Sequence, residues 1–144
     1  MKTLPNYTIE IEAAPNVDDV HAIYDGLSSY NRQHAPQDNY QPMVLVLRDP
    51  AGKVVGGLAG DTYWSWLHVD ALWLEESVRG LTFGSKLLQM AEKEALRRGC
   101  RHVHLDTMSF QAQPFYEKQG YAVFGVLEDL PDGHRRIFLK KDLA

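Results

Sequence analysis

The chain has 144 residues, a length that suits one domain and allows a substantial hydrophobic core. Hydrophobic residues make up 44% and charged residues 24%, as in ordinary globular proteins, and the net charge of −4 disfavours a nucleic-acid partner. Cys100 is the only cysteine, so no disulfide framework is expected. No apolar run approaches the roughly 20 residues of a membrane helix, and the N-terminus lacks the apolar stretch of a signal peptide. We therefore expect a cytoplasmic protein with one domain over residues 1–144, monomeric or homodimeric, that binds neither nucleic acid nor membrane.

The first half of the chain is predicted to contain one helix and four strands. Apolar residues at helical spacing predict the helix over residues 17–30, and Asp18 and Asp19 in its first turn suit the helix dipole. A polar stretch with prolines predicts a loop over residues 33–41. The predicted strands cover residues 7–12, 43–47, 53–66 and 66–74.

The second half alternates helices and strands. Residues 84–98 form the strongest predicted helix, because leucines and alanines make one stripe and Gly99 follows the last turn. A short helix is predicted over residues 114–119. The predicted strands cover residues 101–107, 121–127 and 135–140. The order β-α-β-β-β-α-β-α-β-β predicts an α/β fold, with a central mixed sheet of six to seven strands flanked by helices.

The stretch LWLEESVRGLTFGSKLL, residues 72–88, joins a predicted buried strand to the long helix. The first turn of a helix has unpaired N–H groups and a positive dipole end, so anions bind there. Gly80 and Gly84 allow the backbone to approach a ligand closely. The segment lacks the lysine of a GxxxxGK[ST] phosphate loop and the full GxGxxG dinucleotide pattern. It predicts a phosphate site, with a plain strand-to-helix turn as the alternative.

Two runs of the sequence resemble motifs of one enzyme family. VRGLTFGSKLL resembles motif A of the GNAT family of N-acetyltransferases, Arg/Gln-x-x-Gly-x-Gly/Ala. SFQAQPFYEKQGYAVFG resembles motif B, commonly Asn-x-x-Ala-x-x-Phe/Leu-Tyr-Glu-Lys-x-Gly-Phe/Tyr. A helix and a strand separate the two runs, as in the family, and the segment order matches over nearly the whole chain. The resemblance implies a GNAT fold and the transfer of an acetyl group from acetyl-CoA to a primary amine of a small molecule or peptide.

Two residues depart from these motifs. Thr82 stands where motif A most often has its middle glycine, and Ser109 stands where motif B often has asparagine. A β-branched residue tolerates positive φ poorly, so we expect a negative φ at Thr82 and a slightly altered turn. Ser109 offers a hydroxyl in place of an amide for hydrogen bonds to the backbone or the coenzyme.

The resemblance also implies where coenzyme A lies. Its pantetheine arm is expected between two splayed strands, Trp66–Leu74 and residues 101–107, and its pyrophosphate on the amides of residues 79–85. A backbone N–H near Leu74 would polarise the thioester carbonyl. The implied coenzyme-binding residues are Leu72, Trp73, Leu74, Arg79, Gly80, Leu81, Thr82, Phe83, Gly84, Ser85, Ser109 and Tyr116.

Catalysis needs a proton acceptor for the amine and a proton donor for the leaving thiolate. An amine with a pKa near 10 is mostly protonated at neutral pH, and deprotonating it costs about 4 kcal/mol. Asp70 and His68 are candidate bases, because two residues apart on one strand they point to the same face; Glu75 is a third. Tyr116 has the motif B position whose phenol commonly faces the coenzyme sulfur, which implies that it protonates the thiolate.

Several other side chains have open interpretations. The acceptor pocket or the core could hold the aromatic residues Tyr63, Trp64, Trp66 and Trp73. No metal site is predicted, because no third ligand accompanies His102 and His104. Two alternatives to an enzyme remain: a module of the same fold that binds acyl-CoA without turnover, and an unrelated α/β nucleotide-binding protein. The acceptor is open among small amines, polyamines, antibiotics and peptides.

Overall fold

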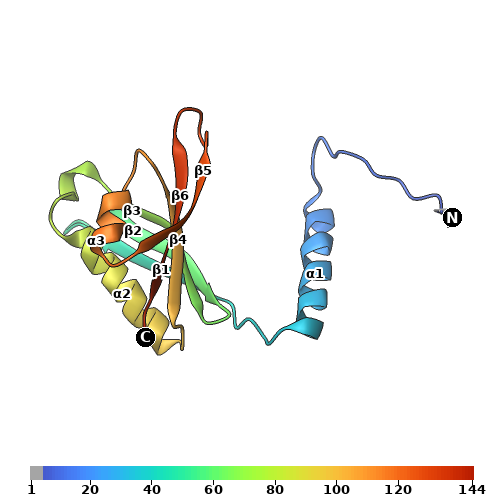
Figure 1. The fold of residues 1–144 in the computed structure, drawn as a ribbon, viewed down its shortest axis with the longest axis horizontal. Coiled ribbons are helices and arrows are strands. Elements are labelled where there is room, and N and C mark those ends of the chain that lie inside the picture. The colour runs from blue at the N-terminus through green and yellow to red at the C-terminus, as the bar shows by residue number, and fades with distance from the viewer. Residues whose placement is uncertain (1–4) are drawn as a thin grey trace. The chain divides into compact units, whose positions relative to one another are not determined.

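The computed structural model describes residues 5–144, which form two compact units that divide after Gln37. The first unit contains one helix, α1 (Val17–His34), and the second contains the sheet and the other helices (Figure 1). α1 begins where the sequence predicts, because the Asn16 side chain accepts a hydrogen bond of 2.8 Å from the backbone N–H of Asp18. It continues beyond the predicted end to His34, since no helix-breaking residue intervenes before Pro36.

The predicted strand over residues 7–12 is wrong. This segment has no regular structure, and the side chains of Tyr7, Ile9 and Ile11 are almost fully exposed. A strand needs a neighbouring strand to pair its backbone groups, and none of the described residues pairs with this segment. Alternating polarity by itself therefore does not make a strand here.

One six-stranded mixed sheet organises the second unit and confirms the predicted fold class. Its strand order is β1-β2-β3-β4-β6-β5, with β3 and β4 parallel and every other neighbouring pair antiparallel. A hairpin bend at residues 64–65 joins the second and third strands. The strands are β1 (Gln41–Arg48), β2 (Val54–Tyr63), β3 (Trp66–Leu74), β4 (His102–Met108), β5 (Ala122–Glu128) and β6 (Arg135–Asp142).

Helix α2 (Phe83–Arg97) packs on one face of this sheet, as its apolar stripe predicts. A short 3-10 helix, η1 (Glu76–Val78), precedes it, and α3 (Gln113–Lys118) follows β4. Cys100 lies buried in the core, as its small apolar side chain suggests. The core joins side chains of α2 to the inward-facing side chains of the strands, chiefly Leu88, Ala91, Ala95, Leu67, Val69, Val103, Leu105, Ile137 and Leu139.

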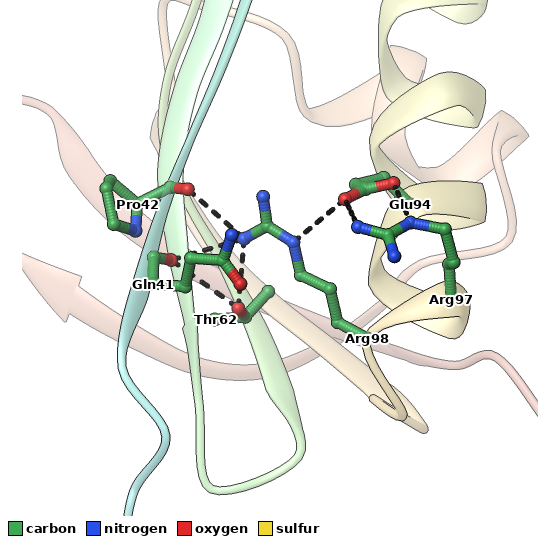
Figure 2. A network of polar contacts seen from close by, with 6 residues as sticks. All are labelled: Gln41, Pro42, Thr62, Glu94, Arg97 and Arg98. Carbon is green, nitrogen blue, oxygen red and sulfur yellow. Dashed lines mark hydrogen bonds and ion pairs between the residues drawn. The ribbon is translucent and has the colours of Figure 1, made fainter.

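The last turn of α2 is tied to the sheet through Arg98 (Figure 2). The Arg98 Nη1 atom donates to the hydroxyl of Thr62 at 3.1 Å and to the carbonyls of Pro42 and Gln41 at 3.1 and 3.3 Å. Its Nε atom donates to Glu94 at 3.0 Å. The side chain is only 13% exposed, and its bonds join the end of α2 to β1 and β2.

Candidate active site

Strands β3 and β4 run together for only part of their length. Their parallel pairing extends from Trp66 and His102 to Val69 and Leu105, and then stops. Beyond that point β3 still pairs with β2, and β4 still pairs with β6. The sheet therefore opens in its middle, and the backbone of β3 and β4 is unpaired on the facing sides. This is the splay that the family resemblance implies.

A β-bulge at Asp70 accompanies the opening. Gly60 of β2 pairs with Val69, whereas Ala59 pairs with Ala71, so Asp70 is an extra residue in β3. A side chain at Gly60 would collide with the carbonyl oxygen of His68, and glycine alone permits this close approach. Bulges re-aim side chains and end regular pairing, and here the bulge lies where β3 leaves β4.

A cleft of about 710 Å³ occupies the opening between the two strands. That volume suits a small-molecule or cofactor site. Of the residues that the sequence assigns to coenzyme binding, Leu72, Trp73, Leu74, Arg79, Gly84 and Tyr116 line it. The other lining residues are Val69, Asp70, Ala71, Asp106, Thr107, Phe110, Gln111, Ala112 and Phe115.

Two carboxylates border the cleft, and they differ in their partners. Asp106 forms a bidentate ion pair with Arg136, at 2.8 Å and 3.0 Å. Asp70 is exposed, and its carboxylate makes no hydrogen bond or ion pair within residues 5–144. Both carboxylates raise the pKa of Arg136, Asp106 through its hydrogen bonds above all, so that guanidinium stays charged. Asp70 is therefore the carboxylate that is open to a ligand.

Tyr116 is the buried titratable group of the cleft. It lies on α3, is 6% exposed, and its ring stands edge-on to Phe115 and Tyr121. Burial, with a smaller contribution from Asp106, raises the pKa of Tyr116 to about 12. The phenol is thus protonated throughout the neutral range and can donate a hydrogen bond into the cleft.

Tyr121 is anchored on the side of α2. Its hydroxyl donates to the buried carboxylate of Glu92 at 2.8 Å, and Lys141 of β6 pairs with the same carboxylate at 3.0 Å. These bonds join α2 to β6 and to the segment after α3, and none of the three side chains lines the cleft.

The turn before α2 differs from the expectation at one residue. Thr82 has a φ of +70°, so the predicted negative φ is wrong. Gly80 is also left-handed, with a φ of +76°, and the two residues together bend the chain into α2. The turn keeps the geometry that glycine favours, and Thr82 bears the strain, on the order of 1–2 kcal/mol for a residue with a Cβ.

The turn also presents backbone donors. The first intrahelical bond of α2 runs from the N–H of Lys86 to the carbonyl of Thr82, which leaves the N–H groups of Phe83, Gly84 and Ser85 without helical partners. Arg79 donates from Nε to the carbonyl of Leu74 at 3.0 Å and so fastens the turn to the end of β3. Leu81 is exposed beside it. The unpaired N–H groups at the start of α2 suit the negatively charged pyrophosphate of coenzyme A.

His68 lies apart from the cleft. Its ring stacks on His104 with centroids 4.7 Å apart, and its Nδ1 atom lies 3.6 Å from Asp61. The Tyr63 hydroxyl lies 3.1 Å from His104 Nε2. The two candidate bases thus have different surroundings, since Asp70 borders the cleft and His68 belongs to a histidine cluster. Glu75, the third candidate, pairs with Lys53 at 3.2 Å.

Ser109 and Gln111 hold the turn before α3, and the sequence singles out only the first of them. Ser109 exchanges hydrogen bonds with the backbone of Arg135, accepting from its N–H at 3.0 Å and donating its own N–H at 2.8 Å. Gln111 lines the cleft, and its Oε1 atom accepts from the N–H of Met108 at 2.7 Å. Its motif position accepts any residue, so no sequence signal marks it. Asp106 could have been noticed in the sequence, because it lies on the same face of β4 as His102 and His104.

The comparisons agree with this geometry. The model of the acetyltransferase (GNAT) family matches residues 7–121. Acetyltransferase Atu2258 of Agrobacterium fabrum is 37% identical over 120 residues, covering 83% of this chain and 88% of its own. Blasticidin-S acetyltransferase of Streptomyces morookaense is 40% identical over 93 residues, covering 64% and 68%. The crystal structure of an acetyltransferase from Bacillus cereus superposes with a TM-score of 0.84 at 36% identity, covering 92% and 97%.

A splayed sheet beside a helix start with unpaired N–H groups suits an acyl-CoA-dependent transferase, and the chain belongs to the acetyltransferase (GNAT) family. Solved structures of the same fold hold coenzyme A or acetyl-coenzyme A. The protein is an acetyl-CoA-dependent acetyltransferase, with acetyl-CoA as its cosubstrate. No helix among the described residues is long and apolar enough to cross a membrane.

Proposed function

We propose that the protein acetylates a primary amine of a small molecule or peptide by direct attack, with Asp70 and Tyr116 on the two sides of the reaction. The observation that carries this proposal is that an unpaired carboxylate and a buried phenol border one cleft. The acceptor amine would enter beside the exposed rings of Trp73 and Phe110, which can hold a cation at their faces.

Asp70 is the proposed proton acceptor. The amine nitrogen attacks the thioester carbon of acetyl-CoA, the new C–N bond forms and the C–S bond breaks. The ammonium form of the amine gives its first proton to the Asp70 carboxylate before attack, directly or through one water, and the second proton, lost from nitrogen as the amide forms, goes to water. His68 is the weaker candidate, because its ring is engaged with His104 and Asp61 outside the cleft.

Tyr116 is the proposed partner of the leaving sulfur. A thiol has an ordinary pKa of about 8.5, so a phenol with a pKa raised to about 12 gives up its proton to the thiolate unfavourably. The phenol therefore stabilises the thiolate as a hydrogen-bond donor, and water supplies the proton afterwards. This modifies the role of full proton donor that the family resemblance implies.

The experiment is a turnover assay with acetyl-CoA and a panel of amines that includes a polyamine, an aminoglycoside, a peptide N-terminus and blasticidin S, which the relative's name suggests. Asp70→Asn is then measured against pH with the best acceptor. We expect a loss of at least tenfold near pH 7 that shrinks as the pH approaches the amine pKa near 10, because a growing fraction of the amine is then already neutral and Asp70 no longer has to remove its first proton.

The matched control is His68→Gln, which we expect to keep the wild-type pH profile. A pH-independent loss in Asp70→Asn would mean that Asp70 serves binding and not proton transfer. The reverse result, a pH-dependent loss in His68→Gln alone, would assign the base to His68. Absence of turnover with every amine, together with acetyl-CoA binding, would favour the sensing module.

A further inference from the structure

A hydrogen bond between α3 and α2 lies beside the proposed phosphate site. The amide Nε2 atom of Gln119, at the end of α3, donates to the hydroxyl oxygen of Ser85 at 3.0 Å. Ser85 is in the first turn of α2, and both side chains are half-buried. One helical turn before Gln119, the ring of Phe115 packs against Gly84, where an added Cβ would lie 3.4 Å from the ring. Two adjacent residues of α2 thus contact two residues of α3 that share one face.

The direction of this bond decides what the Ser85 hydroxyl can do. A hydroxyl has one hydrogen to donate and two lone pairs, and Gln119 occupies one lone pair. Within the described chain the Ser85 hydroxyl donates to no other residue. Its hydrogen is therefore left for a ligand, next to the unpaired N–H groups of Phe83, Gly84 and Ser85.

We propose that Gln119 is a positioning residue for the coenzyme: by donating to Ser85 it fixes that hydroxyl as a donor to the pyrophosphate. This inference rests on the proposed placement of coenzyme A at the turn before α2. A negatively charged oxygen accepts strongly from a hydroxyl held in place, whereas a hydroxyl that can rotate must be ordered on binding. Gln119 thereby also links phosphate binding to α3, the helix that carries Tyr116.

The test compares coenzyme A with pantetheine, which has the same arm and no phosphate. Titration calorimetry gives the coenzyme A dissociation constant, and NMR shift titrations of the amides give that of the weakly binding pantetheine. We expect Ser85→Ala to weaken coenzyme A binding about tenfold and Gln119→Met to weaken it about threefold. Both variants should keep pantetheine affinity within about twofold, because pantetheine has no phosphate to lose.

Gln119→Glu reverses the hydrogen bond and is the sharper variant. A carboxylate only accepts, so it draws the Ser85 hydrogen toward itself and adds a negative charge near the phosphate. We expect a loss of coenzyme A affinity of at least about tenfold. Gln113→Glu, with the same charge change on the same helix, is the matched control and should stay within about twofold of wild type.

The double variant Ser85→Ala with Gln119→Met should bind coenzyme A no more weakly than Ser85→Ala alone, because Gln119 acts through that hydroxyl. Additive losses, equal losses for pantetheine, or unchanged affinity in Gln119→Glu would each overturn the inference. The NMR shifts of wild-type amides on coenzyme A addition distinguish a wrong coenzyme site from a wrong role for Gln119. If residues 79–86 do not shift, the proposed site itself is wrong; if they shift while the Gln119 variants are inert, only the role of Gln119 is wrong.

Discussion

The guanidinium of Arg98 lies 3.1 Å from the hydroxyl of Thr62, and this contact joins the end of α2 to the second strand of the sheet. Thr62 is buried, and the same guanidinium nitrogen also serves the carbonyl of Pro42. One side chain therefore satisfies polar groups on two neighbouring strands.

Arg98→Met should lower the free energy of unfolding by about 2 kcal/mol, because it removes charge-assisted bonds and leaves the oxygen atoms of Thr62 and Pro42 short of a donor. Chemical denaturation measures the change. Arg97→Met is the matched control, since the neighbouring Arg97 pairs with Glu94 but is 70% exposed; its effect should be much smaller than that of Arg98→Met. Equal effects of the two substitutions would show that the contacts with the sheet contribute nothing.

Thr82→Gly should raise the free energy of unfolding by about 0.5–1 kcal/mol. The left-handed backbone destabilises a folded residue with a Cβ by about 1–2 kcal/mol, and glycine removes this strain. Glycine also makes the unfolded chain more flexible, which lowers stability by about 0.5–1 kcal/mol and offsets part of the gain. Denaturant titration gives the difference. Gly99→Ala, at a φ of +86° with open space around it, isolates the same backbone effect and should destabilise by about 1 kcal/mol. A less stable Thr82→Gly protein would contradict the assignment of strain.

Tyr116→Phe should lower kcat at least tenfold while coenzyme A affinity changes little, because the ring that packs is kept and the donor to the sulfur is lost. Single-turnover rates and a binding titration separate the two quantities. Tyr121→Phe is the control: its ring lies 5.9 Å from that of Tyr116, but its hydroxyl serves Glu92 outside the cleft, so turnover should persist. Loss of binding in Tyr116→Phe would make the phenol an anchor.

The histidine cluster predicts a pH dependence of stability. Burial and the neighbouring His68 lower the pKa of His104 below its ordinary value, against smaller opposing contributions from Asp61 and Asp106. The unfolded chain then holds the proton more tightly than the folded protein. The contribution of His104 to stability is therefore full above about pH 6.5 and is lost as the pH falls toward the lowered pKa.

Replacing His104 tests this sign. The urea concentration at the unfolding midpoint of wild type should decrease as the pH is lowered from about 7 to about 5. His104→Gln should make that decrease smaller. His134→Gln, at an exposed histidine whose ring lies edge-on to Phe110, should leave the slope unchanged. A slope that is as steep in His104→Gln as in wild type would place the titrating group elsewhere.

The sequence predicts those parts of the fold that depend on local patterns. The stripe of α2 and the alternation along β4 each identify an element, because burial on one face imposes its period on the chain. The segment over residues 7–12 shows the weakness of the same rule, since alternation does not supply a neighbouring strand. The long helix follows the turn as the motif order predicts, and Tyr116 lines the cleft.

The parts that failed depend on residues distant in the chain. Asp70 and His68 differ in their surroundings because of the bulge, and the bulge depends on Gly60 in another strand. Thr82 takes the conformation that the whole turn requires, which overrides the preference of a single residue. Gln119 is unremarkable until α3 packs against α2 and brings it to Ser85.

The parting of β3 from β4 leaves two strand edges inside a sheet, where most proteins tolerate edges only at the rim. A ligand that fills this gap completes the sheet as a missing strand would, so its binding is linked to folding by mass action. At a concentration about 100 times its dissociation constant, such a ligand adds about 2.7 kcal/mol to the stability of the chain. If coenzyme A occupies this gap as proposed, its binding would make local opening of these two edges rarer.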